Sequence, residues 1–248
     1  MTRQAPMRIG ITGKRDLGGQ DAAVRHALAF AFDTLDADRP DTIKLLLTGL
    51  AEGADTIAAE LALDRRRWRV AAILPFARDV YIEDFAGKPA ASGAAPRQRL
   101  EGLLAHPKVE IRELMPLTNP ITGRPATAAE LRWPETGSNP LRDRHYEQQG
   151  LWLAAIADLL IAVKPEHEPP DRLGGTARIV AYRLGGKPDI AAREVIAASV
   201  ELRPPRPLAN GRGGAVWLID LPRDDGHPPE RDRPFKVLSP DSGAPRRA

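Results

Sequence analysis

The chain has 248 residues, of which 42% are hydrophobic and 28% charged, and its formal net charge of +3 fits one globular α/β domain. The absence of cysteine excludes disulfides, thiolate zinc sites and cysteine nucleophiles. No apolar stretch approaches the ~20 residues of a membrane helix and the first residues lack a signal-peptide pattern, so we expect a cytoplasmic protein without membrane contact.

Apolar periodicity predicts alternating strands and helices in the first third of the chain. Three strands alternate there with two helices, over residues 7–13, 20–37, 42–48, 54–66 and 69–76 in that order. The first helix should face the sheet with Val24, Leu28, Phe32 and Leu35. This alternation implies parallel strands joined by right-handed crossovers.

The remainder of the chain is less regular. We expect a short helix, a strand, a loop-like segment, a helix, a strand, a helix and a final strand over residues 97–104, 109–114, 116–140, 141–157, 158–163, 175–184 and 214–220. Gly150 lies inside the longer helix, where it costs about 1 kcal/mol against alanine, so we expect close packing there.

The end of the chain differs in composition. Residues 222–248 are rich in Pro, Arg and Asp, which predicts a flexible, solvated tail after a single domain over 1–221. Phe235, Val237 and Leu238 are the exception, and they could dock on a partner or a second subunit. Taken together, the elements predict an α/β fold with a mainly parallel sheet and flanking helices.

Three small-residue turns follow predicted strands, at the sheet edge where open α/β proteins bind ligands. They are Gly10-Ile-Thr-Gly-Lys-Arg15, Thr48-Gly-Leu-Ala-Glu-Gly-Ala-Asp55 and Gly174-Gly-Thr176. Glycine permits close backbone approach, and the unpaired first amides of the next helix favour phosphate. Any tight strand-to-helix turn can be Gly-rich, so a purely structural role stays open for each.

We expect a phosphate- and ribose-binding site at these turns. Its candidate residues are Thr12, Gly13, Lys14, Arg15, Thr48, Gly49, Glu52, Gly53, Arg78, Tyr81, Arg144, Tyr146, Gly174, Gly175 and Thr176. Lys14 and Arg15 would clamp phosphate, or else form a solvated surface pair. Glu52 suits a ribose hydroxyl or is an exposed turn residue, while Asp55 is expected to cap the helix.

For the other candidate residues, a packing or solvent-exposed role is as well supported by the sequence as a role in ligand binding. Arg78 could reach a phosphate. Tyr81 could stack on a base, or pack against Phe85 four residues away. Arg144 either points into the cleft or is a solvated helical arginine. The Arg65-Arg-Arg-Trp68 cluster ends a predicted helix, where the dipole favours cations, so we do not expect a nucleic-acid partner.

The five histidines show no metal-ligand spacing with one another or with carboxylates. The chain also contains no Walker lysine motif and no complete Gly-x-Gly-x-x-Gly. We therefore expect neither a metal site nor a bound cofactor.

The ordered set of motifs over about residues 7–185 resembles the SLOG superfamily of Rossmann-like domains. Besides the three turns, it includes Leu74-Pro-Phe-Ala-Arg-Asp-Val-Tyr-Ile-Glu-Asp-Phe85, Arg144-His-Tyr146, Asp158-Leu-Leu-Ile-Ala162 and Gly174-Gly-Thr-Ala-Arg-Ile-Val180. The match is closest to bacterial stand-alone and sensor-type members. The resemblance implies a modified Rossmann-like, doubly wound fold with a pocket for a nucleotide-derived signal, in a conflict or stress-signalling system. We expect a homo-oligomer and a separate effector protein.

One departure from the superfamily concerns catalysis. Its LOG hydrolases resemble each other in a Pro-Gly-Gly-x-Gly-Thr-x-x-Glu signature, whose glutamate acts on the glycosidic bond. Here Ala177, Arg178 and Ile179 follow Thr176, so no carboxylate occupies the matching position and Glu52 would have to act instead. We predict binding of an ADP-ribose-like or cyclic nucleotide; N-glycosidic hydrolysis and single-stranded DNA binding are the alternatives.

Overall fold

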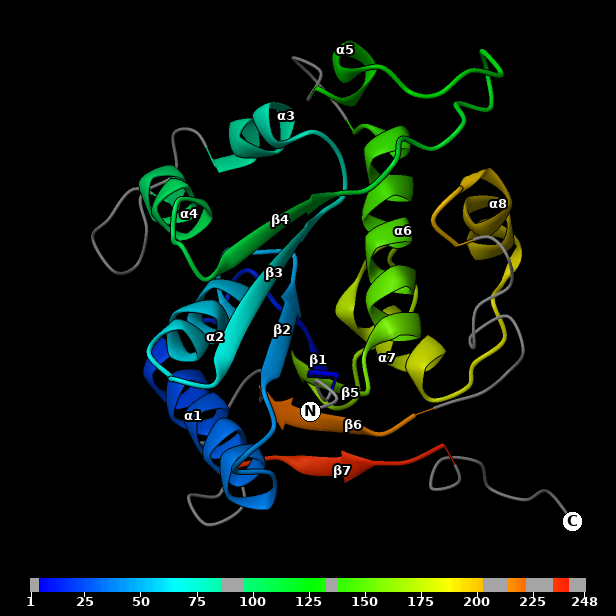
Figure 1. Cartoon of the computed structure of the whole chain (residues 1–248). Helices are drawn as coiled ribbons and strands as arrows, with labels where there is room; N and C mark the ends of the chain where they lie inside the picture. Colours follow the sequence, from blue (N-terminus) through cyan, green and yellow to red (C-terminus); the bar gives the residue numbers. More distant parts are fainter. Residues whose placement is uncertain (1–4, 86–95, 133–137, 203–213, 222–233, 241–248) are drawn as a thin grey trace, which may run out of the picture.

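The apolar runs of the sequence form one seven-stranded sheet (Figure 1). The computed structural model describes residues 5–85, 96–132, 138–202, 214–221 and 234–240. Its strands are β1 Met7–Gly13, β2 Lys44–Thr48, β3 Trp68–Leu74, β4 Val109–Glu113, β5 Leu159–Lys164, β6 Val216–Asp220 and β7 Lys236–Leu238. The strand order is β4-β3-β2-β1-β5-β6-β7, and every neighbouring pair is parallel except β6 and β7.

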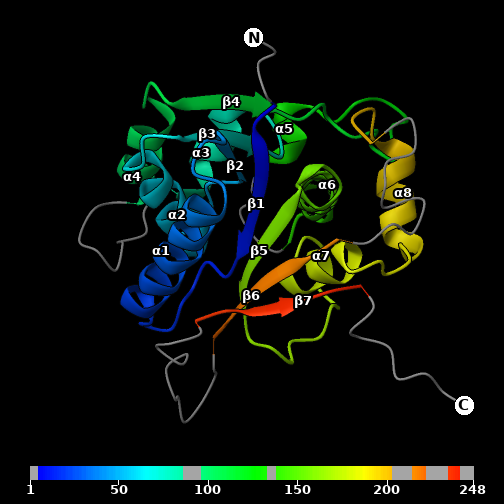
Figure 2. The same cartoon turned by 60° about the horizontal axis from the view of Figure 1, so that its bottom comes forward.

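Helices cover both faces of this sheet. They are α1 Asp21–Asp38, α2 Ala54–Leu63, α3 Arg78–Ile82, α4 Pro96–Leu104, α5 Ala128–Leu131, α6 Pro140–Ile156, α7 Thr176–Arg183 and α8 Ile190–Ala198, with a 3-10 turn η1 at Glu83–Phe85. Helices α1 and α2 lie on one face, and α6, α7 and α8 lie on the other (Figures 1 and 2). The predicted Rossmann-like, doubly wound class is therefore confirmed.

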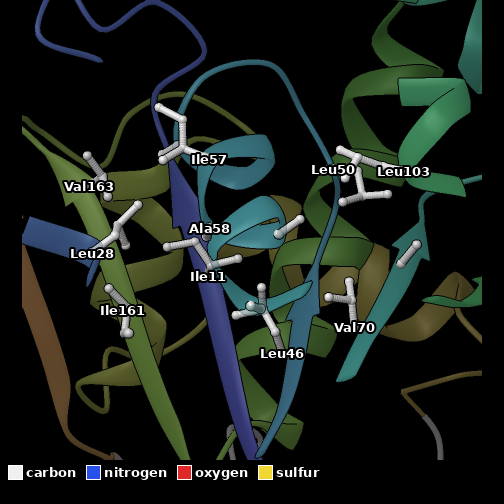
Figure 3. Packing of buried hydrophobic residues seen from close by; sticks show 14 of the residues in the cluster. Ile11, Leu28, Leu46, Leu50, Ile57, Ala58, Val70, Leu103, Ile161 and Val163 are labelled. Atoms are coloured by element: carbon white, nitrogen blue, oxygen red, sulfur yellow. The ribbon is translucent and has the colours of Figure 1, made fainter. Parts of the chain in front are cut away.

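Each face of the sheet has its own hydrophobic layer because successive strand residues point to opposite sides. The layer beneath α1 and α2 contains Ile11, Leu46 and Ile161 from three adjacent strands (Figure 3). The four residues predicted to face the sheet from α1 are all buried there: Val24, Leu28, Phe32 and Leu35. On the other face, Leu160 and Ala162 of β5 pack in a second layer with residues of α6 and α7.

Close packing on that second face explains the glycine inside α6. A Cβ atom at Gly150 would lie 2.0 Å from Cδ1 of Ile179. Only glycine lets α6 and α7 approach this closely. This is the reason expected for the residue from the sequence.

The strand order reverses between β1 and β5. From β1 the chain moves outward through β2 and β3 to β4, then returns to place β5 on the opposite side of β1. The loops that leave β1 and β5 therefore diverge to opposite faces of the sheet. In open α/β sheets such a switch point leaves a crevice outside the carboxyl ends of the strands.

Of the short helices that were not predicted, α5 and α8 each carry a capping signal. Before α5, Thr127 Oγ1 accepts the Glu130 N–H at 3.3 Å, and Glu130 Oε2 accepts the Thr127 N–H at 2.8 Å. This reciprocal pair is a capping box. Before α8, the Asp189 carboxylate accepts the Ala192 N–H at 2.9 Å, which makes Asp189 its N-cap.

The structure also differs from the expected tail. Lys236–Leu238 pairs with β6 as strand β7. The ring of Phe235 stacks on Trp217 of β6, with centroids 4.3 Å apart and planes at 12°. Packing of Phe235 against Trp217 thus holds residues 235–238 on the sheet. Residues 222–233 and 241–248 lie outside the described part of the chain.

Removing residues 223–248 is expected to lower the free energy of unfolding by about 1–2 kcal/mol, because the truncation exposes Trp217 and removes the partly buried Phe235. Thermal unfolding monitored by circular dichroism measures this loss. A chain ending at residue 240 keeps β7 and is the matched comparison. Equal melting temperatures for the two truncated chains would show that β7 adds nothing to stability.

Candidate functional site

A cavity of about 720 Å³ opens at the carboxyl ends of β1, β5 and β6, beside the switch point. It is lined by the end of β1 and the loop that follows it up to the residue before α1, by the first half of α6, by the β5–α7 loop and by the first turn of α7. These residues are Gly13, Lys14, Arg15, Asp16, Leu17, Gly18, Gln20, Asp143, Tyr146, Pro165, Glu168, Pro169, Arg172, Leu173, Gly174, Gly175, Thr176, Ala177 and Arg178, together with Leu221 after β6.

Lys14 lies where β1 enters the cavity. Its backbone N–H donates to the Val163 carbonyl of β5 at 3.0 Å, which ties the turn to the neighbouring strand. Its ammonium group forms an ion pair with the carboxylate of Glu168 from the β5–α7 loop. The first of the predicted phosphate-binding cations is therefore on the cavity wall and paired with an acidic residue.

Arg15 is held by an aromatic ring. Its guanidinium lies over the ring of Tyr146 in α6, with Cζ 5.2 Å from the ring centroid. The Tyr146 hydroxyl in turn donates to Asp84, and Arg142 forms a buried ion pair with the same carboxylate. These contacts fix the Tyr146 ring, which in turn orients Arg15 and leaves its side chain exposed at the cavity.

The same contacts set the protonation states around Arg15. Partial enclosure tends to lower the pKa of Arg15, but the phenol groups of Tyr146 and Tyr81 and the Asp84 carboxylate raise it above its usual value. Burial raises the pKa of Tyr146 to about 12. Arg15 therefore stays cationic, and Tyr146 stays neutral, at any physiological pH.

The second predicted turn supports this region from behind and does not line the cavity. Asp55 is buried, and its carboxylate accepts the Gly49 N–H at 3.1 Å and the Thr48 hydroxyl at 3.2 Å. The expected cap is therefore wrong, because Gly53 is the N-cap of α2 and Asp55 lies in its first turn. Burial raises the pKa of Asp55 to about 7, so its ionisation weakens the fold as the pH rises toward 7.

Gly53 makes a close backbone contact with the first turn. Its φ is +80°, and a Cβ atom there would lie 2.4 Å from the carbonyl oxygen of Arg15 and 2.5 Å from that of Lys14. The Ala54 N–H also donates to the Lys14 carbonyl at 3.3 Å. Gly53 therefore positions the backbone that carries the two cations.

The third turn is fixed by a buried carboxylate that the sequence analysis missed. Glu147 of α6 is fully buried and accepts the Gly174 N–H at 2.7 Å, the Arg178 Nε–H at 2.7 Å and the Tyr182 hydroxyl at 2.9 Å. Arg178 also forms a bidentate ion pair with Asp189, at 2.7 Å for each bond. These contacts hold the start of α7 against α6.

The geometry of this third turn depends on glycine. Gly174 has a φ of +67°, and a Cβ atom there would lie 2.7 Å from Cβ of Tyr146. Gly175 is the N-cap of α7, and Thr176 and Ala177 of its first turn line the cavity. Backbone N–H groups in a first helical turn lack helical acceptors and favour an anion.

The structure therefore brings seven of the fifteen candidate residues to the cavity wall: Gly13, Lys14, Arg15, Tyr146, Gly174, Gly175 and Thr176. The other eight do not line it: Thr12, Thr48, Gly49, Glu52, Gly53, Arg78, Tyr81 and Arg144. Glu52 is half-buried on its turn, and Arg78 is exposed at the start of α3.

Two of the candidates away from the cavity have clear packing roles. Tyr81 is fully buried, donates its hydroxyl to the Gly49 carbonyl at 2.8 Å, and packs edge-on against Phe85 with centroids 5.3 Å apart. Arg144 forms an ion pair with Glu194 of α8 at 3.2 Å. The packing interpretation thus holds for Tyr81, and Arg144 points to α8.

The basic-aromatic cluster at the end of α2 is used within the fold. Trp68 is buried, stacks on Phe32 with centroids 4.2 Å apart, and donates its indole N–H to Asp36 at 2.9 Å. Arg65 pairs with Asp33, and Arg67 with Asp41. This arrangement matches the structural alternative for the cluster.

Among the described residues, no group of His, Asp and Glu side chains is placed to hold a metal ion. His145 is structural, since its Nε2 accepts the Leu117 N–H at 3.1 Å and burial lowers its pKa to about 4. No helix in the described ranges is both long and apolar enough to cross a bilayer. Compared with known proteins, the chain matches no protein-family model and no curated protein sequence.

Proposed function

We propose that the chain binds a nucleotide-derived ligand, containing phosphate and ribose, in the cavity beside the β1–β5 switch point. The observation that carries this proposal is the meeting of two cations and a helix start at that point: Lys14 and Arg15 after β1, and the first turn of α7 after β5. Open α/β sheets bind ligands at such positions. The volume of about 720 Å³ is adequate for a ligand of nucleotide size.

Charge favours an anion on one part of the wall. Four basic residues line the cavity: Lys14, Arg15, Arg172 and Arg178. Lys14 is paired with Glu168, and Arg178 with Glu147 and Asp189. Within the described ranges, Arg15 and Arg172 form no ion pair, so these two guanidinium groups are available for bidentate contacts with phosphate.

Two carboxylates on the cavity wall are placed to accept hydrogen bonds from the ribose of the proposed ligand. Asp16 and Asp143 line the same cavity, and neither forms an ion pair in the part of the chain that the structure describes. Carboxylate oxygens accept hydrogen bonds from ribose hydroxyl groups in dinucleotide-binding folds. We therefore propose a ligand that combines a phosphate with a hydroxyl-bearing sugar, as an ADP-ribose-like molecule or a cyclic nucleotide does.

Hydrolysis by Glu52 is not part of this proposal. A glycosidic bond is cleaved by a carboxylate within hydrogen-bonding reach of the scissile atoms, and Glu52 does not line the cavity. We propose a sensor instead. Its signal to a separate effector, and its assembly as a homo-oligomer, rest on the resemblance to bacterial sensor-type domains.

Replacing Arg15 by alanine is expected to weaken ligand binding by more than about 1 kcal/mol, the range of a charge-assisted hydrogen bond, with little change in melting temperature. Isothermal titration calorimetry measures the affinity. Arg66→Ala, at an exposed position away from the cavity, is the control. A large loss of stability with intact affinity would assign Arg15 a structural role.

A further inference from the structure

The ion pair between Lys14 and Glu168 crosses the cavity wall from one switch-point loop to the other. The two residues are 154 positions apart in the sequence, and both line the cavity. Their side chains are only 23% and 17% exposed. Of the two cations that follow β1, Lys14 is therefore already paired with a carboxylate.

The carboxylate of Glu168 is only partly satisfied. Its Oε2 atom is buried and has no hydrogen-bond partner in the described part of the chain. The contrast is Glu147, whose two carboxylate oxygens accept three hydrogen bonds. A buried acceptor without a donor costs free energy, so Glu168 is less firmly fixed than a structural carboxylate.

The surroundings of Glu168 give it a route to solvent. It lies in the β5–α7 loop between the exposed residues His167 and Pro169. Lys14, in contrast, is anchored through its backbone to β5. Rotation of one side chain would therefore release Glu168 from the wall, while the backbone that carries Lys14 stays in place.

We propose that Glu168 occupies, in the ligand-free chain, the position that the ligand's phosphate takes on Lys14, and that ligand binding displaces it. This inference rests on the proposed function. A phosphate offers more acceptor oxygens than a carboxylate, so it can contact Lys14 and Arg15 together with the first turn of α7. Glu168 then competes with the ligand's phosphate for Lys14 and thereby lowers the affinity of the chain for an anion.

Removing such a competitor should change the stability of the ligand-free chain and the affinity for phosphate in opposite directions. In Glu168→Gln the pair with Lys14 is lost, which should lower the melting temperature of the ligand-free chain by about 2–4 °C. The same substitution frees Lys14, so the affinity for phosphate should rise about tenfold. A residue that only supports the fold would instead lower both quantities.

The test compares Glu168→Gln with wild type and with Glu166→Gln, whose carboxylate pairs with Lys236 outside the cavity. Inorganic phosphate is titrated by 31P NMR and ADP-ribose by calorimetry, and melting temperatures are measured without ligand. We expect tighter phosphate binding and a lower melting temperature for Glu168→Gln, and unchanged affinity for Glu166→Gln. Glu168→Ala repeats the test if the glutamine variant does not fold.

The outcomes separate this inference from the proposed function. Unchanged or weaker binding of phosphate by Glu168→Gln overturns the displacement, even if nucleotides bind the wild type well. Tighter phosphate binding without any nucleotide binding supports the displacement and contradicts the proposed function. If neither probe binds any of the proteins, both are wrong.

Discussion

Replacing Gly53 by valine is expected to lower the free energy of unfolding by about 3 kcal/mol and to abolish ligand binding. The φ of +80° is unfavourable for a branched side chain, and the new Cβ atom would push against the carbonyl oxygens of Lys14 and Arg15. The loop that carries both cations would have to move. Urea unfolding and calorimetry measure the two effects.

Gly19→Val provides the matched control for Gly53→Val. Gly19 has almost the same φ, +79°, but a Cβ atom there would have no heavy atom within 4 Å. Both variants therefore carry the backbone strain, and only Gly53→Val disturbs the cation turn. Equal losses of stability and affinity in the two variants would contradict the contact with Lys14 and Arg15.

Replacing Glu147 by alanine is expected to cost about 3–5 kcal/mol, the effect of removing one partner from a buried ion pair. The substitution leaves the Gly174 N–H and the Tyr182 hydroxyl without an acceptor and removes a charge from beside Arg178. Hydrogen exchange of the amides in α7 should rise along with the loss of global stability.

The isosteric variant separates charge from volume at this position. Glu147→Gln keeps the size of the side chain and one acceptor oxygen, so we expect a smaller loss than for alanine. Faster exchange confined to α7 and the Gly174 turn would localise the effect. An alanine variant as stable as wild type, with protected α7 amides, would show that Glu147 does not hold this turn.

Local patterns were sufficient to predict the sheet. β2, β3 and β5 are largely apolar runs, and small-residue turns follow β1 and β2; this pattern predicts buried parallel strands. Capping signals are also present in the sequence for α5 and α8, in Thr127 with Glu130 and in Asp189. The misplaced cap at Asp55 arose because an acidic residue at a helix start suits both the cap and the first turn.

Contacts between distant residues limited prediction of the site. Glu147 and Glu168 lie 27 and 154 positions from the groups that they bind, Gly174 and Lys14. Nothing in their local sequence distinguishes them from surface glutamates. Gly53 was predicted as a ligand-binding residue, whereas its contact with the backbone of Lys14 and Arg15 needed the register of β1 against β2 and the position of α2.

Calorimetric titration of wild type and Arg15→Ala with ADP-ribose, nucleoside mono- and diphosphates and cyclic nucleotides tests the nucleotide-binding proposal most directly. We predict that at least one of these ligands binds the wild type more tightly than about 1 mM, and that Arg15→Ala weakens its binding at least about fivefold. Binding that is absent for every ligand, or equal for the two proteins, would contradict a nucleotide site beside the β1–β5 switch point.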